Sequence, residues 1–201
     1  MIYLDYNATT PVHPEVRRTV NEFLETEYGN PSSAHAKGRA AKAAIWAARE
    51  SVAAMIGATH VDEVVFTGSA TESNNIALIG ACLEIASDRR HLVISAVEHP
   101  AVWEPALELG RRGWHLSIAP VDSDGRLVIS ELAHLLKGGR VAFVSVMHAN
   151  NEVGTVQPIA EIAASLPSST GTNGSGSVSD GTVTTSSAGC LTASRAGSRT
   201  T

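Results

Sequence analysis

Three short polar segments each follow an apolar run and precede a helical pattern, which is where α/β proteins hold their ligands. The first segment covers residues 67–75, in which Ser69 and Thr71 supply hydroxyl groups among small residues. Small residues let a ligand approach the backbone, and the helix that follows offers unpaired N–H groups and the positive end of its dipole. This pattern predicts a cradle for a phosphate or carboxylate. A capping box, with Ser69 as the N-cap and Glu72 three residues later, explains the same residues without a ligand.

The other two segments carry an imidazole and a pair of amides. His99 lies after an apolar run and directly before Pro100, and an imidazole there can stack on a flat heteroaromatic ring and move protons near neutral pH. A surface or satisfied core histidine is the alternative. Asn150 and Asn151 offer donors and acceptors to a ligand oxygen, whereas an Asx-type turn relieved by Gly154 explains them equally well.

The elements that must position these residues alternate between strands and helices. Apolar and β-branched runs predict strands at residues 64–67, 92–95 and 141–146. Apolar residues at helical spacing predict helices at residues 14–28, 35–56, 71–85, 101–109 and 130–136, with a further helix beginning near Pro158. The near-continuous apolar strands are typical of strands covered on both faces, so the pattern predicts an α/β fold with a mainly parallel sheet.

Composition excludes several classes of function. The 201 residues carry a formal net charge of −5, which gives no basic patch for nucleic acid or an acidic membrane. The sequence shows neither a membrane-spanning apolar run nor a signal peptide, so we expect a cytoplasmic protein. Two cysteines cannot form a disulfide framework or a four-thiolate metal site, and we expect no metal.

The chain divides into parts of different character. We expect an N-terminal segment at residues 1–13 and an incomplete α/β domain at residues 14–167. Residues 168–201 are dominated by Ser, Thr and Gly and hold few large apolar side chains, so we expect them to be disordered. The abrupt change of composition favours a shifted reading frame or a truncation over a genuine linker.

Several motifs occur together in the order seen in cysteine desulfurases, which are pyridoxal-phosphate enzymes of fold type I, class V. They are Tyr3-Leu4-Asp5-Tyr6-Asn7-Ala8-Thr9-Thr10-Pro11, Gly29-Asn30-Pro31-Ser32-Ser33, Ala70-Thr71-Glu72-Ser73-Asn74-Asn75, Glu98-His99 and His148-Ala149-Asn150-Asn151-Glu152-Val153-Gly154. Over residues 1–165 the chain resembles this family. The resemblance implies an incomplete large domain of the fold type I pyridoxal-phosphate transferases.

The resemblance also implies a role for particular residues. Ala70 and Thr71 would hold the phosphate of pyridoxal 5′-phosphate, His99 would stack on its ring and take part in proton transfer as the catalytic residue, and Asn151 would reach the phenolic oxygen. Asn7 would lie near the substrate. The family converts L-cysteine to L-alanine, passing the sulfur as an enzyme persulfide to sulfur-acceptor proteins for iron–sulfur cluster assembly, and it works as a homodimer.

Other parts of the family pattern are missing from this sequence. The resemblance calls for an aspartate and a glutamine after the helix near Pro158, and for a Ser-x-His-Lys stretch with the Schiff-base lysine, whereas the last lysine here is Lys137. Cys190 lies in a Ser/Gly-rich stretch loosely similar to the loop of the persulfide cysteine, but a free thiol in a flexible tail explains it. We therefore expect the chain alone to be inactive. A fragment of a selenocysteine lyase or other class V enzyme, or a noncatalytic product that pairs with intact subunits, are the alternatives.

Overall fold

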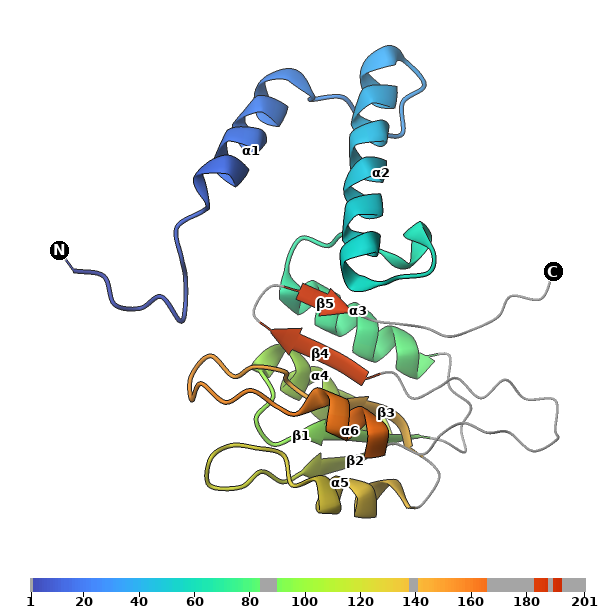
Figure 1. Ribbon diagram of the computed structural model, residues 1–201. Coiled ribbons are helices and arrows are strands. Elements are labelled where there is room, and N and C mark those ends of the chain that lie inside the picture. Colours follow the sequence, from blue (N-terminus) through green and yellow to red (C-terminus); the bar gives the residue numbers. More distant parts are fainter. Residues whose placement is uncertain (1, 84–89, 138–140, 166–182, 188–189, 193–201) are drawn as a thin grey trace. The chain divides into compact units, whose positions relative to one another are not determined.

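The computed structural model describes residues 2–83, 90–137, 141–165, 183–187 and 190–192 (Figure 1). The chain forms two compact units, residues 1–65 and residues 66–201. The sequence placed boundaries at residues 13 and 167 instead, and those boundaries stay predictions. In the part of the chain that the structure describes, no helix is long and apolar enough to cross a membrane.

The N-terminal unit contains the two expected long helices. Helix α1 spans Pro14–Thr26 with its proline in the first turn, and α2 spans Ala36–Ile56 and ends at Gly57, whose φ of 70° gives a left-handed C-cap. A short 3-10 helix, η1, follows at Val61–Glu63. The apolar side chains of α1 are 44% to 74% exposed, so its amphipathic pattern predicted the helix but nothing described in this structure covers its apolar stripe.

The second unit is a sheet with alternating helices. Its elements are α3 (Ala70–Leu83), β1 (His91–Ser95), α4 (Pro100–Arg111), β2 (His115–Ala119), α5 (Ile129–Leu136), β3 (Val141–Ser145), α6 (Ile159–Ser165), β4 (Val183–Ser187) and β5 (Cys190–Thr192). The strand order is β2-β1-β3-β4-β5. Strands β1 to β4 pair in parallel, and β5 is antiparallel to β4. The predicted α/β fold with a mainly parallel sheet is confirmed.

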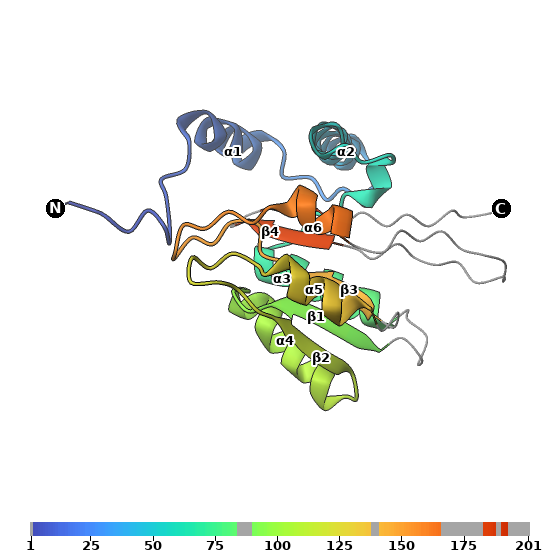
Figure 2. The ribbon, with the colours of Figure 1, turned by 60° about the horizontal axis from the view of Figure 1, so that its bottom comes forward.

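Helices cover both faces of this sheet (Figures 1 and 2). Leu92 and Ile94 of β1 pack in one apolar cluster with α3 and α4, whereas Val93 packs in a second cluster with α5 and α6. Phe143 and Val144 of β3 divide between the two clusters in the same way. Because successive strand residues point to opposite faces, a continuous apolar run is what a strand between two helical layers requires.

One strand assignment made from the sequence is wrong, and one strand was missed. Residues 64–67 form no strand, and Val65 and Phe66 are 65% and 50% exposed. Their β-branched and aromatic side chains favour extended backbone, but a strand also needs a neighbour to pair with. The sequence interpretation also missed β2, which pairs with β1 from His91↔His115 to Ser95↔Ala119. Its alternating polar residues gave no continuous apolar run.

Two short stretches of the C-terminal segment are described as strands, β4 and β5. Strand β4 pairs in parallel with β3 through Val144↔Val183 and Ser145↔Thr184, and β5 pairs with β4. The expectation of disorder across residues 168–201 stays a prediction, and the rest of that range lies outside the described residues. Runs of Val and Thr have high strand propensity even where few large apolar side chains are present.

Within the second unit, the side chain of Gln157 holds a turn that is distant from it in sequence. Its Oε1 accepts a hydrogen bond from the backbone N–H of Leu127 at 2.8 Å, and its Nε2 donates to the carbonyl of Gly125 at 2.7 Å. Both Gln157 and Leu127 are buried. Because the side chain pairs with the buried N–H of Leu127 and the partly buried carbonyl of Gly125, it stabilises the turn that leads into α5.

We predict that Gln157→Leu lowers the free energy of unfolding by about 2 kcal/mol, since it leaves a buried N–H and a carbonyl without partners. Urea unfolding followed by circular dichroism measures this loss. The matched control is Glu161→Leu, which introduces the same side chain at an exposed position of α6 and is expected to leave stability nearly unchanged. Equal stabilities for the two variants would contradict the prediction.

Candidate functional site

Ser69 caps the first turn of α3, but the box that the sequence offered as an alternative is only half formed. Ser69 Oγ accepts from the N–H of Glu72 at 3.1 Å, whereas Glu72 Oε2 accepts at 2.7 Å from the N–H of Gly68, one residue before the cap. The N–H groups of Ala70 and Thr71 have no acceptor inside the helix, because they precede its first turn of hydrogen bonds. Capping and anion binding are therefore compatible here, since the box uses other donors.

His99 is the N-cap residue directly before α4, and its ring caps that helix. The imidazole Nδ1 accepts from the backbone N–H of Ala101 at 3.0 Å, and Pro100 occupies the first helical position. A ring nitrogen that accepts a hydrogen bond carries no proton, so the neutral imidazole holds its proton on Nε2. The cap fixes the ring and leaves Nε2 as a donor.

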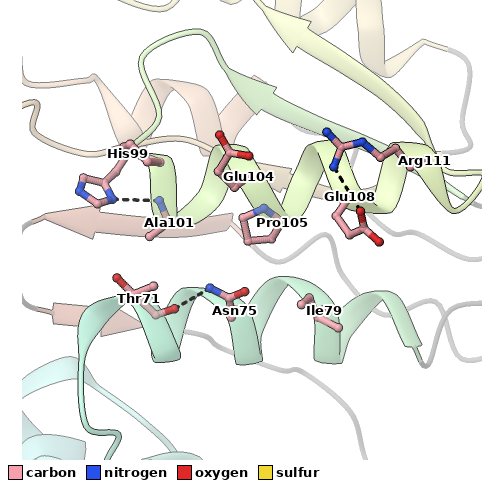
Figure 3. A pocket seen from close by; sticks show the side chains of 10 residues that line it. Thr71, Asn75, Ile79, His99, Ala101, Glu104, Pro105, Glu108 and Arg111 are labelled. Atoms are coloured by element: carbon pink, nitrogen blue, oxygen red, sulfur yellow. Dashed lines mark hydrogen bonds and ion pairs between the residues drawn. The ribbon is translucent and has the colours of Figure 1, made fainter.

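A cavity of about 590 Å³ brings Thr71 and His99 together. It lies between α3 and α4 and is lined by Thr71, Asn75, Ile79, His99, Pro100, Ala101, Glu104, Pro105, Glu108 and Arg111. Figure 3 shows Thr71 and His99 at the same end of this cavity, one from each helix. The side-chain amide of Asn75 lies along α3, where its Nδ2 donates to the carbonyl of Thr71 at 2.8 Å. The first two sequence-predicted segments thus face one space.

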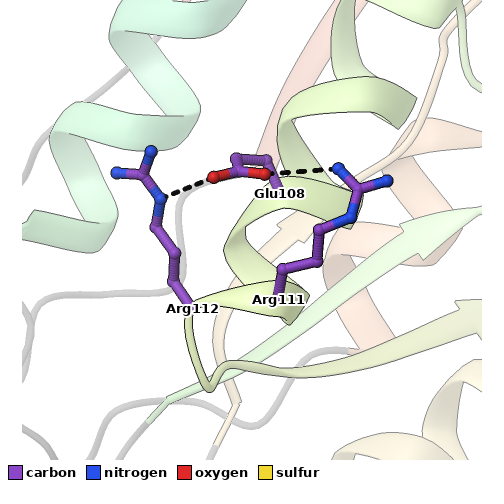
Figure 4. A network of polar contacts seen from close by, with 3 residues as sticks. All are labelled: Glu108, Arg111 and Arg112. Atoms are coloured by element: carbon purple, nitrogen blue, oxygen red, sulfur yellow. Dashed lines mark hydrogen bonds and ion pairs between the residues drawn. The ribbon is translucent and has the colours of Figure 1, made fainter.

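The opposite end of the cavity carries charged side chains that pair with one another. Glu108 bonds to Arg112 at 2.8 Å and to Arg111 at 3.2 Å (Figure 4). Hydrogen bonds from Arg112 and Arg111 lower the pKa of Glu108. These exposed pairs contribute little stability. Their consequence is that both arginines are engaged within α4 and its last turn, away from Thr71.

The third predicted segment lies beside the second but does not line the cavity. Asn150 Nδ2 donates to the carbonyl of Val97 at 3.3 Å, two residues before His99. Its Oδ1 accepts from the N–H groups of Glu152 and Val153, which is the Asx-type turn that the sequence left open. Asn151 is not among the cavity-lining residues, and Asn7 belongs to the other unit. The functional roles of Asn151 and Asn7 stay predictions.

Sequence reasoning missed Glu98 as a residue of the site. It lies between Val97 and His99, and Ser95 Oγ donates to its Oε1 at 2.8 Å. Burial raises the pKa of Glu98 to about 7, and the hydrogen bond from Ser95 only partly opposes that effect. The Glu98-His99 pair was noticed as a motif, but a carboxyl that turns inward cannot be recognised without the fold.

No metal centre is found among the residues that the structure describes, and the thiol of Cys82 is not reactive. These residues hold no group of three or more potential metal-ligating side chains. Cys82 is buried, and burial raises the pKa of its thiol to about 11, so it stays protonated and unreactive near neutral pH. Cys190 begins β5.

Comparison with known proteins identifies the family. The class-V aminotransferase family matches residues 2–186. Cysteine desulfurase IscS of Dictyoglomus turgidum is 43% identical over 162 residues, which cover 81% of this chain and 41% of that protein. The chain therefore spans about two fifths of the length of this curated relative.

Two solved structures agree with this assignment. A NifS-like protein superposes with a TM-score of 0.80 at 33% identity, covering 90% of this chain and 47% of the other. SspA in complex with cysteine superposes with a TM-score of 0.75 at 32% identity, covering 81% of this chain and 46% of the other. The family predicted from the ordered motifs is confirmed: this chain belongs to the class-V aminotransferase family, and its relatives by sequence include proteins named cysteine desulfurase.

Proposed function

We propose that this chain carries the cofactor-binding part of a pyridoxal-phosphate-dependent cysteine desulfurase. The observation that supports this most strongly is the cavity that Thr71 and His99 share, because it places an anion-binding helix start next to an imidazole. The relative named as a cysteine desulfurase and the solved complex of SspA with cysteine favour L-cysteine as the substrate of the whole enzyme.

The residues present fit pyridoxal phosphate. A phosphate needs several donors with a positive field, and the start of α3 offers the N–H groups of Ala70 and Thr71 and the Thr71 hydroxyl. The aromatic ring needs a flat neighbour, and His99 presents its imidazole at the same end of the cavity. Once bound, the cofactor supplies an electron-withdrawing ring that stabilises negative charge on an amino acid substrate.

The residues of this chain would act by holding and orienting. Ala70 and Thr71 would bind the phosphate, and Asn151 would reach the phenolic oxygen from the β3 loop. His99 would stack on the ring and move a proton through Nε2, because Nδ1 is occupied by the N–H of Ala101. Asn7 would contribute to placing the substrate. In the whole enzyme, we propose that L-cysteine yields L-alanine, that sulfur passes as a persulfide to acceptor proteins for iron–sulfur cluster assembly, and that two subunits pair.

We further propose that the cofactor is held here without a covalent bond and that this chain alone does not turn over L-cysteine. Lys137 follows α5 and precedes β3, so it lies toward the amino end of that strand, whereas His99 and Asn151 lie beyond the carboxyl ends of β1 and β3. Lys37 and Lys42 belong to the other unit. No lysine is therefore placed within the described part of this unit to bond to a cofactor beside His99.

Mixing the purified chain with pyridoxal phosphate and L-cysteine tests both proposals. We expect saturable quenching of protein fluorescence by the cofactor, no covalent adduct in the mass spectrum after borohydride reduction, and no sulfide release. Absence of saturable binding would overturn the cofactor-binding proposal. An adduct together with sulfide release would overturn the proposal of noncovalent, inactive binding. Association with an intact cysteine desulfurase, measured by sedimentation, separates a pairing subunit from an inert one.

We predict that Thr71→Val weakens the binding of pyridoxal phosphate by about tenfold, because it removes one hydrogen bond to a charged group while keeping the shape of the side chain. Fluorescence titration measures the affinity. The matched control is Thr19→Val, which changes the same side chain on α1, where Thr19 Oγ1 bonds only to the carbonyl of Glu15. Titration with pyridoxal, which lacks the phosphate, is expected to show no difference between Thr71→Val and the unchanged chain. A Thr71→Val affinity for the phosphate form within twofold of the unchanged chain would contradict the assignment.

A further inference from the structure

The side chain of Glu98 folds back onto the end of β1 instead of pointing to solvent. Ser95 Oγ donates to Oε1 at 2.8 Å, and the N–H of Glu98 donates to the carbonyl of Ser95 at 3.4 Å. The second oxygen, Oε2, is buried and has no hydrogen-bond partner of normal geometry among the described residues. These contacts close the four-residue turn that leads from β1 to His99.

The same turn is joined to the loop after β3. Asn150 Nδ2 bonds to the carbonyl of Val97, the residue before Glu98. The backbone N–H of Asn150 donates to the carbonyl of Thr155 at 2.9 Å, and that of Gly154 donates back to Asn150 at the same distance. The β3 loop is therefore a compact unit anchored on the β1 turn.

Glu98 lies at the seam between these two loops. The hydroxyl of Ser145, the last residue of β3, and the backbone of Met147 face its carboxyl. The groups that face Glu98 from β1 and β3 are thus hydroxyls and backbone, and none of them titrates. His99 and His148 are the titratable neighbours along the two loops.

We propose that Glu98 is a positioning residue for this site: its inward-turned carboxyl locks the β1–α4 turn against the end of β3, and thereby holds His99 over the cavity and the Asn150 loop beside it. The functional consequence rests on the proposed role of His99 in cofactor binding. The claim that Glu98 fixes the turn does not depend on that role, because the contact with Ser95 and the Asn150–Val97 bond are made within the chain itself.

The lock is expected to respond to protons near neutral pH. Burial raises the pKa of Glu98 to about 7, and the hydrogen bonds from Ser95, Met147 and Ser145 oppose this only in part, so the carboxyl loses its proton near pH 7 and leaves a buried charge. A protonated carboxyl fits the same surroundings better. The turn and the β3 loop should therefore loosen together as the pH rises through 7.

Two substitutions separate positioning from charge. Glu98→Gln keeps an Oε1 that accepts from Ser95 but cannot ionise, whereas Glu98→Ala removes the contact altogether. Glu131→Gln, at an exposed position in the first turn of α5, is the matched control. At pH 6 we expect Glu98→Ala to weaken pyridoxal phosphate binding about tenfold and Glu98→Gln to stay within twofold of the unchanged chain. Equal affinities for Glu98→Ala and the unchanged chain would overturn the claim that Glu98 supports cofactor binding.

A ligand-free measurement tests the lock itself. In NMR titrations from pH 5.5 to 8.5, we expect the Val97 amide and the Asn150 side-chain amide to share an inflection with the carboxyl carbon of Glu98. Glu98→Gln should remove that inflection, and Glu131→Gln should keep it. His99 and His148 are unchanged in every variant, so the difference between Glu98→Gln and Glu131→Gln isolates the carboxyl of Glu98. An inflection that persists in Glu98→Gln would overturn the inference, whereas failure of the unchanged chain to bind cofactor would overturn only the proposed function.

Discussion

Replacing Gly38 with alanine is expected to destabilise the N-terminal unit by about 3 kcal/mol, because the added methyl group would overlap backbone atoms that cannot rotate away. A Cβ at this position would lie 2.2 Å from the carbonyl oxygen of Ser33 and 2.7 Å from that of Asn30. The loop before α2 thus crosses the first turn of that helix with backbone against backbone. Gly38 is required here for space.

Other contacts also show that the loop before α2 packs tightly against the first turn of that helix. A Cβ on Gly29 would lie 2.3 Å from the carbonyl oxygen of Lys37, so the approach is tight from both sides. His35 Nδ1 accepts from the N–H of Gly38 at 3.2 Å and caps the helix. Ser33 N–H donates to the carbonyl of Asn30 at 2.9 Å. Moving the loop to accept a methyl group would break these bonds as well.

Hydrogen exchange of the α2 amides, with urea unfolding of the whole chain, measures the effect of Gly38→Ala. The matched control is Gly80→Ala on α3, where a Cβ meets nothing within 4 Å. That substitution is expected to stabilise by up to about 1 kcal/mol, because alanine has the higher helix propensity. If Gly38→Ala kept the exchange protection of the unchanged chain, the crossing would not be as tight as described.

The second large effect is expected at Glu98, where Glu98→Gln should raise stability at pH 8 but not at pH 4.5. The pKa of Glu98 rises from its ordinary value of 4.5 to about 7 in the folded chain. Between these two values the folded state keeps a proton that the unfolded state releases, so the free energy of unfolding falls as the pH rises. The favourable contribution is complete below pH 4.5 and is lost above about pH 7.

Glutamine stays neutral and escapes this loss. One pKa unit corresponds to about 1.4 kcal/mol, so the variant should exceed the unchanged chain by about 3 kcal/mol at pH 8. Urea unfolding at pH 4.5 and pH 8 measures the difference. Glu131→Gln, an exposed control, should show a similar small effect at both values. A Glu98→Gln variant that is no more stable than the unchanged chain at pH 8 would mean that the carboxyl is not buried as an anion.

The layered fold could be predicted from the sequence because it depends on local patterns. Apolar runs such as Leu92–Ser95 mark strands covered on both faces, and proline and Gly57 mark helix ends. Residues 64–67 and β2 were misassigned because strand pairing depends on neighbours distant in sequence. Local propensity reports what the backbone favours, and it does not report which partner is present.

The candidate site divides in the same way. Thr71 and His99 were predicted because each lies where a polar turn leads into a helix, and a family resemblance supported them. Glu98 and Gln157 were missed because their roles come from contacts that the chain makes only when folded, such as the bond between Gln157 and Leu127. Gly38 was missed for a related reason: a side chain at this position is excluded only because the loop before α2 crosses it in the folded chain.

The proposed cofactor site is tested most directly by mapping which NMR signals change on addition of pyridoxal phosphate. We expect the largest changes on the backbone amides of Ala70 and Thr71 and on the ring of His99, and we expect inorganic phosphate to move the two amides while leaving the ring unchanged. Changes centred elsewhere in the chain, or none at millimolar cofactor, would contradict a phosphate held at the start of α3 beside His99.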